Sequence, residues 1–181
     1  MECNMKKMVC LVVALLSLCN FVFLTSCQAS DPDAPRGYVG MQDESGDYIL
    51  YVPQTWVQDE THGMLSAYAE KDSAISVSVT AVSESRNATS MEEYWQSYRE
   101  EFENTFADFQ LIEEKTQTTL GGESAQKYVF SGTVAGKSYQ FMQVLAERNA
   151  VIYTYTYSAP QERFDTMLEQ AVAIQSNFVF R

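Results

Sequence analysis

The side chains that carry most protein chemistry are scarce in this sequence. His62 is the single histidine, and the four cysteines are Cys3, Cys10, Cys19 and Cys27. A Ser-His-acid arrangement would have to use His62, but no G-x-S-x-G motif accompanies it. We therefore interpret His62, in the segment DETHGML, as a solvated loop residue, and we do not expect an enzyme.

Metal and cofactor motifs are also missing from the sequence. A structural zinc site needs several Cys or His ligands, and no cysteine follows residue 27. The acidic segment DESGD at residues 43–47 offers oxygen ligands but does not have EF-hand spacing. We interpret it as a solvated turn, with weak cation binding as the alternative. The sequence has no phosphate loop or dinucleotide fingerprint, so we expect no metal and no cofactor.

The first 27 residues have the order of an export signal. Lys6 and Lys7 precede an apolar run over residues 8–24, which ends in small residues. Residues 24–27, LTSC, resemble the bacterial lipobox, in which signal peptidase cuts before a cysteine that carries a diacylglyceryl group. On that resemblance, residues 1–26 are a lipoprotein signal peptide and Cys27 becomes the first residue, carrying fatty acids such as palmitate. The other cysteines leave with the leader.

An uncleaved membrane helix over residues 8–24 is the alternative, because about 17 residues is the lower edge of what spans a bilayer. Ser17 and Asn20 weaken this alternative. Met5 fits the translation start as well as Met1 does. Both interpretations place the rest of the chain at the cell membrane, on its extracytoplasmic face.

The charge balance excludes some partners. The chain has 12 basic and 24 acidic residues, and loss of residues 1–26 changes the net charge from −12 to −13. So acidic a body is repelled by nucleic acid and by anionic lipid surfaces. We therefore expect contact with the membrane through a lipid anchor, an envelope or membrane protein as partner, and no nucleic acid.

The sequence beyond Cys27 divides into a tether and one domain. Residues 28–37, QASDPDAPRG, contain two prolines and no apolar period, so residues 27–37 are expected to be the lipidated cysteine and a flexible tether. Fully extended, ten residues reach at most about 35 Å. Residues 38–181 are long enough for one domain, and the chain's ten Phe and eleven Tyr can fill a core.

The domain's pattern predicts an α+β fold with an antiparallel β-sheet flanked by helices. Residues 38–41 and 47–53 suit one hairpin, and residues 64–70 and 74–82 suit a second. A helix should begin after Ser90, where SMEE is a capping box followed by an aromatic stripe. A meander is expected over residues 109–158, with turns near Gly121, Gly136 and Asn149. A second helix should start at Pro160, and a short strand should end the chain.

The segment VIYTYTY is the strongest binding candidate in this pattern. Tyr153, Tyr155 and Tyr157 share one strand face, while Ile152, Thr154 and Thr156 share the other. The tyrosines are interpreted as a row packed under a helix, with their hydroxyls at the rim. The alternative is an open aromatic face that binds a peptide or a glycan, and solvent exposure of Tyr153 and Tyr155 decides between the two.

Several of these segments together resemble the PsbP-like family, which shares the Mog1/PsbP α/β/α sandwich. The resemblance covers roughly residues 38–181, with Thr55 where family members commonly have glycine. It is carried by these segments: YVPQTW, SMEEYWQSY, LGGESAQKYVF, YQFMQVLAERNAVIYTYTYSAP and QSNFVF.

The resemblance implies a fold that other proteins use for docking. On that basis we expect a membrane-anchored, non-catalytic, protein-docking or assembly-support module. A small-ligand or glycan-binding lipoprotein is the alternative, and an enzyme with an unlocated carboxylate pair comes third. A pocket with convergent polar groups would favour the second of these, and a flat apolar patch would favour the first.

Overall fold

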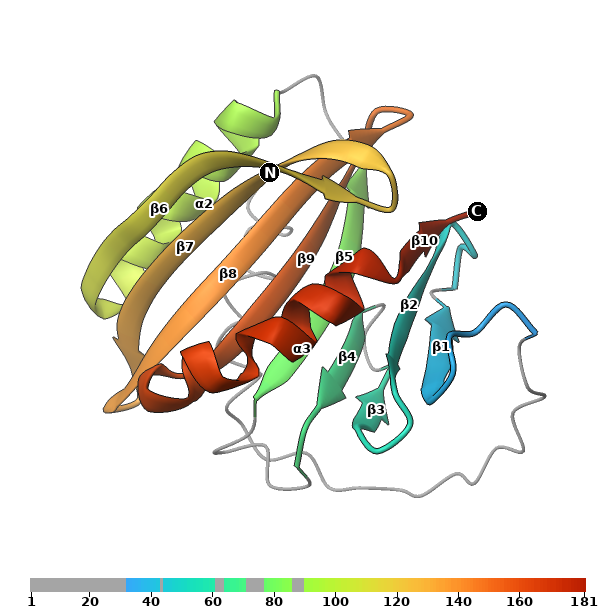
Figure 1. The fold of residues 1–181 in the computed structure, drawn as a ribbon. Coiled ribbons are helices and arrows are strands. Elements are labelled where there is room, and N and C mark those ends of the chain that lie inside the picture. Colours follow the sequence, from blue (N-terminus) through green and yellow to red (C-terminus); the bar gives the residue numbers. More distant parts are fainter. Residues whose placement is uncertain (1–31, 43, 61–63, 71–76, 86–89) are drawn as a thin grey trace.

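Two antiparallel sheets and two α-helices make up the described fold (Figure 1). The computed structural model describes residues 32–42, 44–60, 64–70, 77–85 and 90–181. Its large sheet has seven strands in the order β3-β4-β5-β9-β8-β7-β6, and its small sheet has the order β1-β2-β10. The expectation of an α+β fold, with an antiparallel sheet flanked by helices, is confirmed.

The last four strands along the large sheet form the predicted meander. They are β6 (Ala107–Leu120), β7 (Glu123–Val134), β8 (Lys137–Arg148) and β9 (Val151–Pro160). Each is joined to the next by a two-residue turn in which both residues have positive φ: Gly121-Gly122, Ala135-Gly136 and Asn149-Ala150. Such turns match the twist of the paired strands. The predicted turn positions are thus confirmed, with alanine also accepting the left-handed conformation.

The other half of the large sheet is built from shorter strands. β3 (Val57–Asp59) pairs with β4 (Leu65–Tyr68), which pairs with β5 (Ser78–Ser85), and β5 pairs with β9. The second predicted hairpin is therefore present, but its second strand runs three residues beyond the predicted end. β3 is not predictable from the sequence, because three residues are too short to show an alternation.

The helix α2 (Met91–Thr105) begins as its capping box predicts. Ser90 Oγ accepts a hydrogen bond from the Glu93 amide, and Glu93 Oε2 accepts one from the Ser90 amide, each at 3.2 Å. The aromatic stripe of α2 is buried against β7 and β8, where it forms a core with Tyr128, Phe130 and Phe141. We call the face of the large sheet that α2 covers the α2 side.

The helix α3 (Phe164–Ser176) covers the opposite face, the α3 side. It follows a 3₁₀ turn at Gln161–Arg163, so Pro160 ends β9 and the α-helix starts four residues later than predicted. The small sheet packs on the same side. Its strands are β1 (Tyr38–Gln42), β2 (Tyr48–Pro53) and β10 (Phe178–Phe180), and its buried residues share one core with α3 and the large sheet.

The edge strand β6 is poorly suited to pairing with another chain. Its register to β7 shifts at three places, and Asp108 and Lys115 have positive φ. Glu113, Glu114 and Lys115 add charge along it. Bulges and charges on an edge strand prevent edge-to-edge association.

Candidate functional site

The tyrosine row of β9 lies under α3 and is closed to ligands. Tyr153 is 5 % exposed, and Tyr155 and Tyr157 are fully buried. The Tyr155 hydroxyl donates a hydrogen bond to the Ala171 carbonyl oxygen, and the Tyr157 hydroxyl donates one to the Phe164 carbonyl oxygen, both at 2.8 Å. The alternative of an open aromatic binding face formed by Tyr153, Tyr155 and Tyr157 is therefore wrong.

The sequence predicted that the tyrosine hydroxyls lie at the rim of the sheet. The hydroxyls of Tyr155 and Tyr157 do not lie there. They are buried and donate to backbone carbonyls of α3, so the row helps to fix the helix on the sheet. Gln175 of α3 completes this pattern, because its amide nitrogen donates to the Thr119 carbonyl oxygen at 2.9 Å. The polar groups on the α3 side thus serve the fold itself.

The α2 side carries a strip of small polar side chains where the α3 side carries tyrosines. One row crosses four strands through directly opposite residues: Ser66, Thr80, Thr156 and Gln143. Ser66 and Thr80 hydroxyls lie 3.3 Å apart, and Gln143 Nε2 donates to Thr156 Oγ1 at 3.3 Å. Gln143 lies on the α2 side because its alternate neighbours Phe141 and Leu145 pack in the α2 core.

Three more side chains flank this row on the same face. Ser78 and Ser158 are directly opposite each other, with hydroxyls 2.7 Å apart, and Thr154 lies opposite Leu145. We call the seven side chains the hydroxyl strip: Ser66, Ser78, Thr80, Gln143, Thr154, Thr156 and Ser158. All are buried. Such a density of buried polar groups is unusual for a sheet interior, where apolar residues predominate.

Unsatisfied polar atoms occur on the α2 side of the sheet. Among the described residues, four buried side-chain atoms have no hydrogen-bond partner: Trp95 Nε1, Glu101 Oε2, Gln143 Oε1 and Thr154 Oγ1. Trp95 and Glu101 belong to α2, and the other two belong to the hydroxyl strip. Since most buried polar groups are paired, each of these atoms is a departure from the usual pattern.

A pair of tyrosines ties α2 to the sheet beside the strip. The hydroxyls of Tyr94 and Tyr98 both donate to Glu84 Oε2 of β5, at 2.9 and 2.8 Å. Burial, then the Glu84 charge, raises the pKa of Tyr94. The Thr154 hydroxyl interacts with Tyr94 and acts in the opposite direction, lowering that pKa. Burial likewise raises the pKa of Tyr98.

The tyrosines of the α2 side predict how stability changes in alkali. Burial also raises the pKa of Tyr128, to about 12, against 10.0 for an ordinary tyrosine. A raised pKa in the folded state stabilises the fold fully below pH 10 and progressively less above it, because the unfolded chain ionises first. We expect unfolding above pH 10 to coincide with late tyrosine ionisation, followed by ultraviolet absorbance and circular dichroism. Full ionisation near pH 10 of a chain that stays folded would contradict this prediction.

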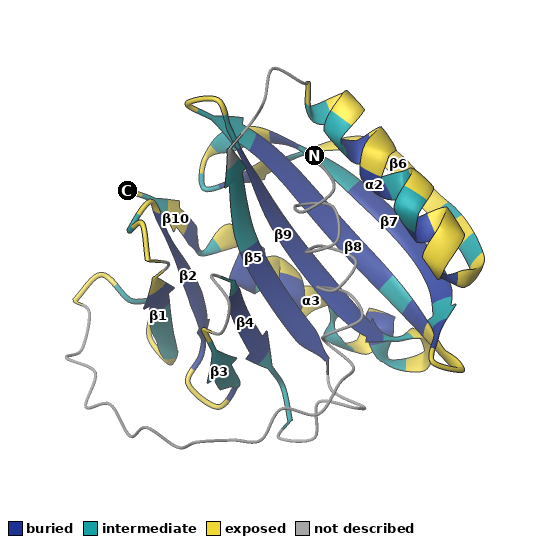
Figure 2. Cartoon of the chain, turned by 180° about the vertical axis from the view of Figure 1, so that it is seen from behind, coloured by how far each residue is buried: buried dark blue, intermediate teal, exposed yellow. Residues whose placement is uncertain are grey.

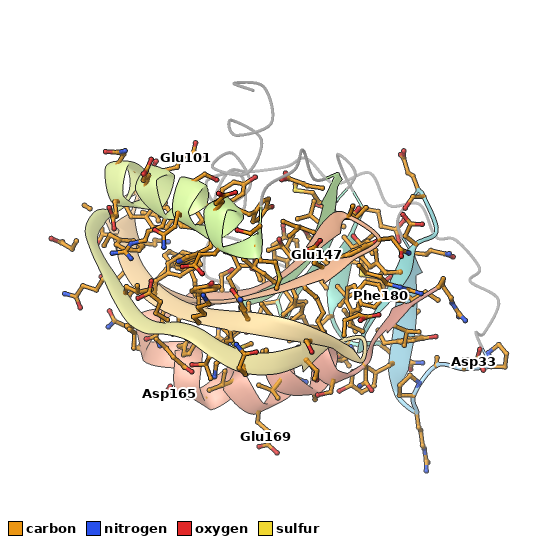
Figure 3. All side chains as sticks on the ribbon, turned by 90° about the horizontal axis from the view of Figure 1, so that it is seen from above. Asp33, Glu101, Glu147, Asp165, Glu169 and Phe180 are labelled. Carbon is orange, nitrogen blue, oxygen red and sulfur yellow. The ribbon has the colours of Figure 1, made fainter. Side chains whose placement is uncertain are left out.

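Two carboxylates lie on the same face of the sheet as the strip, and a third belongs to α2. Glu84 of β5 and Glu147 of β8 are both directly opposite Ile152 of β9. Glu101 of α2 points away from α3's acidic residues Asp165 and Glu169, which lie across the sheet (Figure 3). Burial raises the pKa of Glu101. The sheet face that carries the strip therefore has acidic side chains at its Glu84 and Glu147 end.

Several residues singled out from the sequence lie outside the described residues. They are Cys27, His62 and Asp43. The neighbouring turn residue Ser45 donates a hydrogen bond to Asp47 Oδ2 at 2.8 Å. In the described ranges, no group of three or more His, Cys, Asp or Glu side chains is placed to hold a metal ion. None of the helices described there has the length and apolarity needed to cross a membrane.

The sequence shows which residues on each strand are polar, but it does not show which strands lie side by side to form the hydroxyl strip. Ser78 and Thr80 alternate with apolar residues in the sequence, and Thr154 and Thr156 share a face of β9. The missing information was that β5 pairs with β9, about 75 residues away, which makes one strip of the two polar faces.

Comparison with known proteins gives structural likeness without sequence likeness. No family model matches the chain, and no curated protein matches it in sequence. Among solved structures, cyanobacterial PsbP (CyanoP) from Synechocystis has a TM-score of 0.60 at 11 % identity, covering 86 % of this chain and 99 % of its own. The Mycobacterium tuberculosis protein LpqN, described as involved in cell envelope biogenesis, has a TM-score of 0.59 at 16 % identity, covering 78 % and 89 %.

A third likeness is to a eukaryotic protein. The Saccharomyces cerevisiae Ran-binding protein Mog1p has a TM-score of 0.55 at 11 % identity, covering 79 % of this chain and 95 % of its own. Likeness at such low identity concerns the fold, and the same architecture serves proteins with different tasks.

Proposed function

We propose that this chain, which has the Mog1/PsbP-like fold, is an extracytoplasmic lipoprotein anchored through Cys27 whose domain acts by binding and not by catalysis. The anchor rests on the segment LTSC and on the export-signal order that precedes it. Its domain would dock onto another component of the cell envelope and support assembly there. Among structurally similar proteins, LpqN is described as involved in cell envelope biogenesis, and Mog1p binds Ran.

The observation that carries the proposal is the asymmetry of the large sheet. On the α3 side, buried hydroxyls of Tyr155 and Tyr157 reach helix carbonyls. On the α2 side, Gln143 Oε1 is buried without a hydrogen-bond partner among the described residues. A sheet that is satisfied on one face and unsatisfied on the other supports a binding role for the second face.

A protein partner is the first candidate, and a small ligand or a glycan is the second. In the part of the chain that the structure describes, the large exposed hydrophobic residues are Ile112, Val172 and Val179, on three different elements. That scatter offers no large apolar patch for a protein. The hydroxyl strip is the specific observation that favours the second candidate.

The anchor can be tested by metabolic labelling of the full-length protein with a fatty acid. We expect Cys27→Ala to abolish labelling and to release or misprocess the protein, because the acylated sulfur is lost. Cys19→Ala, eight residues upstream in the leader, is the matched control and should be labelled normally. Normal labelling of Cys27→Ala would overturn the lipoprotein assignment.

The docking role can be tested separately by crosslinking in cells followed by mass spectrometry. A lipid-anchored docking module should recover an envelope or membrane component with crosslinks on the α2 side. Recovery of cytoplasmic proteins alone would contradict the role, whatever the labelling experiment shows.

A further inference from the structure

We propose that the domain stands on the lipid surface with one edge of the small sheet toward the bilayer, and with α2 and β6 at the end farthest from it. We call residues 32–42, the segment before β1 together with β1, the entry edge. This inference rests on the proposed function in one respect, namely the anchor at Cys27. It goes further by naming the surface of the domain that meets the lipid.

The segment before β1 belongs to the folded domain. The amide of Gln54, directly after β2, donates a hydrogen bond to the Gly37 carbonyl oxygen at 3.0 Å. Asp33 Oδ2 lies 4.0 Å from Nη1 of Arg181, the residue directly after β10. These contacts hold the segment against the small sheet from Asp33 onward. The chain therefore enters the domain at the entry edge.

The distance from the anchor to the entry edge has a short upper limit. Four residues, 28–31, separate Cys27 from Pro32, the first described residue. A chain extends at most about 3.6 Å per residue, so the Cα atoms of Cys27 and Pro32 are at most about 18 Å apart. An acylated cysteine lies at the lipid surface. The start of the entry edge therefore stays within about 18 Å of that surface, whatever conformation residues 28–31 adopt.

The domain is broader than this reach. Six spacings between the seven strands of the large sheet amount to about 29 Å, at about 4.8 Å each. The small sheet lies at one end of the domain, and α2 with β6 lies at the other (Figure 1, Figure 2). The tether is thus too short for the α2 and β6 end to face the bilayer while the entry edge points away.

Charge on the two helices opposes a flat orientation. α2 has five glutamates and one arginine, and Asp165 and Glu169 are exposed on α3, across the sheet (Figure 3). An anionic lipid surface repels such side chains. Glu44 and Asp47, in the turn after β1, are acidic too, so charge does not attract the entry edge to lipid. The tether holds it there, and the acidic helices keep the domain upright.

The entry edge is open to solvent. The side chains of Asp33, Arg36 and Gln42 are all exposed, although the strand between them is half-buried or buried. A lipid surface can therefore approach these residues without the displacement of any other part of the chain. The orientation leaves the opposite end, with α2 and β6, for contact with an envelope component.

Energy transfer to a lipid dye measures how far a labelled site lies from the bilayer. No cysteine follows Cys27, so an introduced cysteine is the only free thiol of the processed, acylated protein. Gln42→Cys on β1 and Gln96→Cys on α2 make the same change at two exposed positions, at opposite ends of the domain. Each purified lipidated variant is labelled with a coumarin maleimide. It is then placed in vesicles of phosphatidylcholine and phosphatidylglycerol that contain rhodamine-labelled phosphatidylethanolamine.

We expect transfer from Gln42→Cys to be at least about twofold more efficient than transfer from Gln96→Cys. If circular dichroism shows that Gln42→Cys is not folded, Arg36→Cys replaces it, with the same expected result. Equal transfer from the two ends, in a protein that floats with the vesicles, would overturn the orientation and leave the anchor standing. A protein that does not float with vesicles would refute the anchor itself, and this inference with it.

A longer tether tests the argument from reach. Insertion of ten Gly and Ser residues after Ala29 raises the limit from about 18 Å to about 54 Å. Transfer from Gln42→Cys should then fall toward the value for Gln96→Cys. If the difference between the two sites stays as large as before, something other than the tether sets the orientation, and the inference is wrong.

Discussion

Replacing Phe102 with alanine is expected to lower the free energy of unfolding by about 3–5 kcal/mol, the usual loss for a buried aromatic side chain. Phe102 is fully buried at the centre of the α2 core. Its ring lies 5.0 Å from that of Phe130 and 5.3 Å from that of Phe106, measured between centroids. Removal of the ring leaves a cavity that neither the helix nor the sheet can close. Equilibrium unfolding in urea measures the loss.

An exposed apolar residue provides the control for Phe102. Ile112 on the edge strand β6 is 55 % exposed, and Ile112→Ala should change stability by only about 0.5 kcal/mol, as surface substitutions usually do. A decrease of less than about 1 kcal/mol in the free energy of unfolding of Phe102→Ala would mean that the α2 core is not packed as described. In a rigid core, removal of an aromatic ring leaves a cavity and destabilises the fold by more than that.

Replacing Gly121 with alanine is expected to cost about 2–5 kcal/mol, through two separate effects. Gly121 has a φ of 56°, a conformation that costs other residues about 1–2 kcal/mol. In addition, an added Cβ would lie 2.5 Å from Phe180 Cδ2 and 3.1 Å from Phe178 Cδ1. Overpacking of this kind typically adds about 1–3 kcal/mol. Thermal unfolding of the variant, followed by circular dichroism, tests the sum.

The neighbouring Gly122 separates the two effects. It has a φ of 87°, but nothing lies within 4 Å of the position that its Cβ would take. Gly122→Ala should therefore show the backbone cost alone, about 1–2 kcal/mol. If the two variants prove equally destabilised, β10 does not pack against the β6–β7 turn, and the described docking of the C-terminal strand is refuted.

Local structure was largely predictable from the sequence, because its signals are local. The capping box at Ser90 and the aromatic stripe behind it located α2, and the glycine and asparagine turns located the meander. Pairing between distant segments was not predictable. Nothing in residues 48–53 indicates that β10 will join β2. This pairing divides the strands into two sheets, whereas the sequence pattern predicts one.

At the candidate site, too, local features were predictable from the sequence and long-range packing was not. The alternation in VIYTYTY correctly separated tyrosines from threonines, but not which face would be covered. The larger, amphipathic tyrosines filled the space beneath α3, where their hydroxyls found helix carbonyls. The threonines of the other face lie beside the serines and threonine of β5. Which face is covered depends on elements that are distant in the sequence.

The small sheet also determines how the domain would respond to mechanical load. Both ends of the described chain meet there: β1 and β10 flank β2, Asp33 Oδ2 lies 4.0 Å from Arg181 Nη1, and the Arg181 amide donates to the Asp47 carbonyl oxygen. A pull on the residues before β1 would first strain these contacts and the core beneath α3. The hydroxyl strip, on the other face of the large sheet, lies away from that force path, so a pull on the residues before β1 would reach it last.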